Sequence, residues 1–137
     1  MSEYGMTINV PGTVEEVKPQ VQAALKAQGF GILTEIDVQK TMKEKLGAEY
    51  EPFLILGACN PSLANQALTA DRSIGLLLPC NVTLRKVGPN VEVSILDPDM
   101  MFRVVDAETK KKIPTLPQEA KKKLQAALAS LEHPGGD

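Results

Sequence analysis

The sequence predicts an α+β fold with a mainly antiparallel sheet and helices on one face. Three observations lead to this prediction. Two segments in which apolar and polar side chains alternate flank a short turn, which is typical of a β-hairpin. Two longer segments, one near each end of the chain, carry apolar residues three and four positions apart, as amphipathic helices do. Strand and helix segments do not alternate strictly, and this favours an antiparallel sheet over a parallel one.

The first half of the chain begins with a strand over residues 4–10, where apolar side chains occupy every second position. A helix is predicted over residues 14–28. Thr13 and Glu16 form a capping box at its start, in which the side chain of each residue bonds the backbone N–H of the other. Residues 32–46 then predict a second strand followed by a short helix.

The second half begins with a continuously apolar segment, residues 53–59, which predicts an interior strand buried on both faces. Asn60-Pro61 follows at once, and this pair is typical of a helix N-terminus. Residues 80–86 and 91–95 are the two strands of the hairpin. The last helix begins after Thr115 and has an apolar stripe along its length.

The 137 residues are expected to form a single domain, residues 1–137, with its core at about residues 4–131 and a flexible tail over residues 132–137 that holds the one histidine. The net charge of −2 and the lack of tryptophan argue against specific nucleic-acid binding. We interpret the lysines of residues 110–112 and 121–123 as a solvated surface. No signal peptide or long apolar segment is evident, so we expect a cytoplasmic protein with no membrane partner.

Two Cys-Asn dipeptides, one on each side of the third helix, are the main candidates for a functional site. The candidate ligand-binding residues are Cys59, Asn60, Pro61, Cys80 and Asn81. If the strand that ends at Cys59 pairs antiparallel with the strand that starts at Cys80, both thiols lie near one end of the sheet. Cys59 also precedes a helix N-terminus, where backbone N–H groups favour a thiolate. The alternative is that both cysteines are small buried core residues.

Four residues are candidates for a metal site: Cys59, Cys80, Asp97 and Asp99. The two cysteines lack the nearby histidine or further cysteine that zinc sites use. The two aspartates flank Pro98, where they can act as cation ligands or as an acid and a base, but Asp-Pro is also a common start of a turn. Phosphate-binding and nucleophile motifs are absent, so no cofactor is predicted and an enzyme is the less favoured class.

Four segments resemble the bacterial and archaeal family called domain of unknown function 302. They are Tyr4-Gly5-Met6-Thr7, the run from Gly29 to Ile36, Gly57-Ala58-Cys59-Asn60-Pro61, and the run from Ile74 to Asn81. The resemblance implies a β-α-β(4)-α fold similar to the TATA-binding-protein-like architecture, often as a homodimer. It implies no activity and no catalytic residue.

These observations favour a non-enzymatic domain that binds a small ligand or a partner and acts as a homodimer. The alternative is a thiol-dependent redox or soft-metal-handling protein that uses Cys59 and Cys80. The two hypotheses differ in the state of the thiols, because the second one needs a thiolate near neutral pH.

Overall fold

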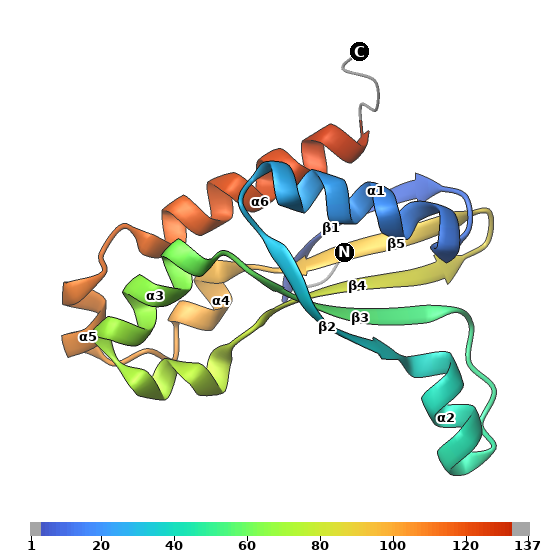
Figure 1. Cartoon of the computed structure of the whole chain (residues 1–137), viewed down its shortest axis with the longest axis horizontal. Coiled ribbons are helices and arrows are strands. Elements are labelled where there is room, and N and C mark those ends of the chain that lie inside the picture. Colours follow the sequence, from blue (N-terminus) through green and yellow to red (C-terminus); the bar gives the residue numbers. More distant parts are fainter. Residues whose placement is uncertain (1–3, 133–137) are drawn as a thin grey trace.

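The protein is built on one five-stranded sheet, seen in a computed structural model that describes residues 4–132 (Figure 1). The strand order is β1-β5-β4-β3-β2, and every neighbouring pair is antiparallel. The strands are β1 (Gly5–Pro11), β2 (Gly31–Asp37), β3 (Phe53–Cys59), β4 (Cys80–Val87) and β5 (Asn90–Leu96). The helices are α1 (Val14–Ala27), α2 (Val38–Leu46), α3 (Pro61–Ala70), the 3₁₀ helix η1 (Arg72–Leu77), α4 (Pro98–Phe102), α5 (Ala107–Lys112) and α6 (Leu116–Glu132).

Helices α1 and α6 cover one face of the sheet (Figure 1). The predicted capping box begins α1: the Glu16 N–H donates to the Thr13 hydroxyl at 3.2 Å, and the Thr13 N–H donates to the Glu16 carboxylate at 2.9 Å. The apolar stripes of both helices are buried against the sheet. The core order β1-α1-β2-β3-β4-β5-α6 confirms the predicted α+β fold of β-α-β(4)-α type.

Within residues 4–132, the opposite face of the sheet, here called the open face, carries no helix layer. The strand registers place Thr7, Ser94 and Thr83 side by side in one row across it. The predicted burial of β3 on both faces is wrong, because only its core-facing side chains, such as Leu56 and Ala58, lie under helices. β3 is an interior strand, but β4 is the middle one.

The remaining helices lie at the ends of the sheet. We call the group α3, η1, α4 and α5 the helical end; it packs beyond the strand ends at the left of Figure 1, and α6 reaches it through contacts with α3 and α4. α2 lies at the opposite end beside β2 and β3. Of the predicted tail, residues 132–137, Glu132 is the last residue of α6, and the others, including His133, lie outside the described residues. None of the helices within residues 4–132 has the length and apolar character needed to cross a membrane.

Candidate functional site

The two Cys-Asn segments meet at the end of the sheet that faces the helical end. β3 and β4 pair antiparallel with Ala58 opposite Cys80, so the predicted pairing of these strands is confirmed. Cys59 lies one residue beyond this pair, at the end of β3, and Gly31 of β2 is its partner on the other side. The loop that joins α1 to β2 therefore lies next to the Cys59-Asn60 segment.

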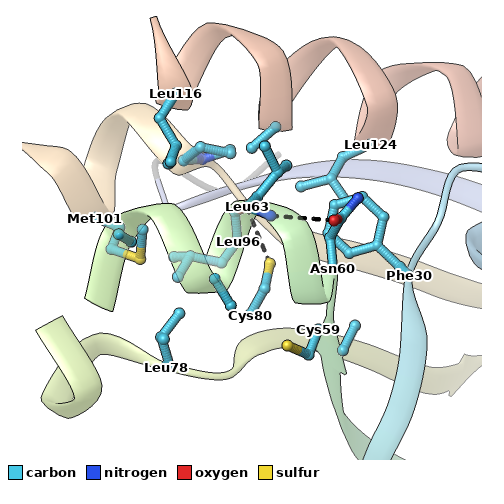
Figure 2. A pocket seen from close by; sticks show the side chains of 15 residues that line it. Phe30, Cys59, Asn60, Leu63, Leu78, Cys80, Leu96, Met101, Leu116 and Leu124 are labelled. Carbon is cyan, nitrogen blue, oxygen red and sulfur yellow. Dashed lines mark hydrogen bonds between the residues drawn. The ribbon is translucent and has the colours of Figure 1, made fainter. Parts of the chain in front are cut away.

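A small cavity of about 60 Å³ lies at this junction. Its walls come from β3, β4, β5, α3, α4 and α6, and almost all of the side chains that form them are apolar. Figure 2 shows these side chains pointing into one space between α3, α6 and the strand ends. The lining residues are Phe30, Ala58, Cys59, Asn60, Leu63, Ala64, Ala67, Leu78, Cys80, Leu96, Pro98, Met101, Leu116, Ala120 and Leu124.

Cys80 is the thiol that points into this apolar interior. It shares its face of the sheet with Val82 and Leu84, which are fully buried. Its sulfur lies 3.9 Å from the Leu96 carbonyl, the dashed contact in Figure 2, and no charged group faces it among the cavity residues. Burial raises the pKa of the Cys80 thiol to about 12, so the group stays protonated at neutral pH.

Cys59 has a different environment although it borders the same cavity. Side chains alternate along a strand, so Cys59 follows Phe53, Ile55 and Gly57 on the open face, whereas Ala58 and Cys80 lie on the core face. The two sulfur atoms point in different directions in Figure 2, and both thiols are free. The structure therefore places the two cysteines at the neighbouring ends of the paired strands β3 and β4, and no disulfide joins them.

Asn60 holds the start of α3 and connects it to the end of α1. Its Oδ1 accepts the Leu63 N–H at 3.2 Å, which is the predicted helix cap, and its Nδ2 donates to the Gln28 carbonyl at 3.4 Å. Gly29 has a φ of +85°, and a Cβ at this position would lie 3.0 Å from Asn60 Nδ2. A glycine is required there both for the backbone conformation and for the close approach of Asn60.

Gly57 also allows a close approach of neighbouring side chains, here on the open face. A Cβ on Gly57 would lie 2.7 Å from Cγ of Pro79 and would also clash with the Thr34 hydroxyl. Pro79 therefore packs directly on the backbone of β3, which fixes the chain that leads into Cys80. The segments around Gly29, Gly57 and Pro79 thus position the cavity through close backbone contacts.

Two of the five candidate ligand-binding residues lie outside the cavity. Pro61 is the first residue of α3 and lines a shallow surface hollow with Gly29 and Ile32. Asn81 is exposed on the open face, next to Thr83 and Ser94. Cys59, Asn60 and Cys80 are the three candidates that border the cavity.

The two aspartates proposed as metal ligands have local partners. Asp97 caps α4 by accepting the Asp99 N–H at 2.9 Å. The Lys121 ammonium lies 3.3 Å from the Asp97 carboxylate and 2.8 Å from that of Asp99, which connects α6 to α4. The hydrogen bond from Lys121 to Asp99, and then that to Asp97, raises the pKa of the lysine. Within residues 4–132, no group of three or more His, Cys, Asp or Glu side chains is arranged to hold a metal ion.

The apolar wall of the cavity is the part of the site that sequence reasoning missed. Leu63 belongs to α3 and Leu124 to the apolar stripe of α6, but nothing in the sequence showed that both line one cavity with Cys80. Met101 and Pro98 belong to α4, a helix that the sequence analysis treated as a turn. The N-cap pattern of Asp97 followed by Pro98 was the available signal for that helix.

The fold and the site define a small α+β domain with a mostly apolar cavity at one end of an antiparallel sheet. The model of the family DUF302, a domain of unknown function, matches residues 6–131, and the chain belongs to this family. The chain is also similar to a solved structure, the crystal structure of an uncharacterized conserved DUF302 protein from Bacillus stearothermophilus. That similarity has a TM-score of 0.81 and 25% sequence identity, and covers 93% of this chain and 98% of the other. No curated protein matches the chain.

Proposed function

We propose that this protein is a non-enzymatic binding domain that takes a short apolar group of a small ligand, or of a partner, into the cavity beside Cys80, and that it acts as a homodimer. The observation that carries this proposal is the cavity itself. Its apolar side chains come from the strand ends and from α3, α4 and α6, and they surround the protonated Cys80 thiol. A site of this kind can bind an apolar group, and the Cys80 thiol, which is protonated near neutral pH, neither takes up a proton nor attacks a substrate there.

The size of the cavity limits what enters it. Typical pockets for whole ligands have volumes of roughly 300–1,000 Å³, and an apolar cavity of about 150 Å³ holds benzene. The volume of about 60 Å³ therefore suits a short alkyl group, with the rest of the ligand outside. Asn60 and Cys59 border the cavity and supply polar atoms next to the apolar interior.

The environment of Cys80 favours binding over thiol chemistry. A redox or metal-binding cysteine reacts as the thiolate, which nearby positive charges or a metal stabilise. Burial without such a charge has the opposite effect and raises the pKa of Cys80 to about 12. The raised pKa argues against a redox or metal-binding role of Cys80, and so against a reactive pair of Cys59 and Cys80.

The homodimer is supported by the single-layer sheet. Helices cover one face, while the open face and the outer strands have no cover within residues 4–132. Closed two-fold dimers are the commonest oligomers of soluble proteins, and a second copy at the free edge of an outer strand gives that edge a partner.

A titration monitored by NMR tests ligand binding. Butan-1-ol supplies a short alkyl group, and butyrate and butylammonium supply the same group with a charge. We expect shifts at Leu63, Cys80 and Leu124 with butan-1-ol. The substitution Ala120→Leu fills the cavity and should abolish these shifts. Ala126→Leu is the matched control, because Ala126 is exposed on the same helix.

Shifts that are spread over the surface, or that persist unchanged in Ala120→Leu, would contradict binding in the cavity. Rapid oxidation of both thiols to a disulfide in the native protein would instead support the alternative hypothesis.

A further inference from the structure

The two outer strands of the sheet differ in how their free edges are protected. Edge strands expose unpaired N–H and C=O groups, and proteins usually block such edges with charges, prolines or β-bulges. The outer strand β2 has a bulge between Ile32 and Thr34 and carries Glu35 and Asp37. The outer strand β1 has no charged residue, its only proline is its last residue, Pro11, and its register with β5 runs without a bulge from Gly5 to Pro11.

The free backbone groups of β1 belong to its odd-numbered residues. The Tyr4 carbonyl accepts the Asp97 N–H at 2.9 Å, so the even-numbered residues of the strand face β5. Thr7 and Asn9 therefore direct their backbone groups outward, and none of residues 4–132 bonds to their outward N–H groups. Pro11 is also an odd-numbered residue. Its missing N–H would point away from β5, so the hydrogen bonds between β1 and β5 stay intact.

We infer that β1 pairs antiparallel with β1 of a second copy across a two-fold axis at Ile8, which joins the two sheets into one. This inference rests on the proposed homodimer and names its interface. In this register Thr7 lies opposite the partner's Asn9, and each such pair exchanges both backbone hydrogen bonds. Met6 lies opposite the partner's Val10, and Ile8 lies opposite its own copy.

The strand is complementary to itself in this arrangement. Apolar side chains meet on the face covered by helices, and polar side chains meet on the open face. No charged side chain is brought against another, whereas the edge of β2 would have to accommodate its bulge and its carboxylates. Met6 and Ile8 are only half-buried at the margin of the core in one copy, and the second copy covers them.

Sedimentation equilibrium of the full chain tests this interface. Asn9→Pro removes one outward N–H, and Asn9→Lys places a charge at the edge that natural edge strands use to prevent pairing. We expect both substitutions to raise the dissociation constant of the dimer at least tenfold. Leu33→Lys is the matched control on the other edge, since Leu33 is exposed at the bulge of β2, and it should leave the dimer unchanged.

Hydrogen exchange gives a second readout. The amide protons of Thr7 and Asn9 should exchange more slowly as the protein concentration rises, while the already bonded amide of Ile8 should change little. A dimer that withstands both Asn9 substitutions would overturn this interface and leave the proposed homodimer in place. A wild-type protein that is monomeric at every concentration, or one whose β1 edge captures an extended peptide instead, would overturn both.

Discussion

Cys80 and Cys59 belong to the same type of dipeptide, lie at paired strand ends and border one cavity, yet their surroundings differ. Cys80 points to the core face, where burial raises the pKa of its thiol to about 12. Ala58 points to the core face, so the side chain of the next residue, Cys59, points the opposite way, at the margin of the open face. One position along a strand decides which cysteine belongs to the interior.

The comparison shows that a repeated motif does not create two equivalent sites. Asn60 follows Cys59 as a helix cap and bonds the end of α1, whereas Asn81 follows Cys80 as an exposed side chain on the open face. The two dipeptides therefore have different structural roles. What they share is that Cys59, Asn60 and Cys80 line the same cavity.

Introducing a carboxylate separates the two positions most strongly. Cys80→Asp places an unpaired charge among apolar side chains, which should lower the free energy of unfolding by about 3–5 kcal/mol at neutral pH. Cys59→Asp lies at the border of the cavity near the N-terminus of α3, and its cost should stay below about 1 kcal/mol. Urea unfolding of both variants measures the difference. Equal losses of stability would contradict the different surroundings of Cys80 and Cys59.

Alkylation by iodoacetamide compares the thiols without changing the interior. A pKa of about 12 leaves Cys80 with roughly a thousandth of the thiolate that an ordinary thiol has near neutral pH. In the Cys59→Ser variant, we expect the folded protein to react about a thousandfold more slowly than the unfolded chain. Folded and unfolded rates that agree within a few-fold would show that Cys80 is accessible and ordinary.

Alkaline pH should reveal the same thiol as a loss of stability. The unfolded chain loses the Cys80 proton at an ordinary pKa of about 8.5, whereas the folded protein keeps it up to about pH 12. The unfolded state thus binds fewer protons between these values, and the free energy of unfolding falls as pH rises, by up to about 1.4 kcal/mol per pH unit.

The control for this prediction is Cys80→Ala, which keeps the tyrosines and lysines that also titrate at high pH. The slope of stability against pH should be steeper in the wild type than in this variant between pH 9 and 11. Identical slopes would contradict the raised pKa.

The fold could be predicted in large part because local patterns were consistent with it. The capping box at Thr13, the Asn60-Pro61 start of α3, and the alternation in β4 and β5 are each local signals, and each is confirmed. The burial of β3 was mispredicted because an apolar run does not reveal that only one face of the sheet is covered. The short helices α4 and α5 were missed because they depend on tertiary contacts more than on their own pattern. α4 packs against α6, and α5 bonds to Asp71 and to the Ala70 carbonyl at the end of α3.

The site was only partly predictable for a similar reason. Strand pairing brought Cys59 and Cys80 to one end of the sheet, as the sequence indicated. The wall made by Leu124 and Met101 depends on contacts between segments far apart in the chain, which no local pattern encodes. The partners of Asp97 and Asp99 were likewise out of reach, because Lys121 lies on a distant helix.

The central claim is that the space beside Cys80 is a dry apolar cavity that admits a small apolar group. Diffraction from a crystal pressurised with xenon tests this claim most directly, since xenon enters empty apolar cavities. We expect a xenon atom among Leu63, Cys80 and Leu124 in the wild type and in Ala126→Leu, and none in Ala120→Leu. Hydrogen-bonded water in this space, or xenon bound only elsewhere, would contradict it.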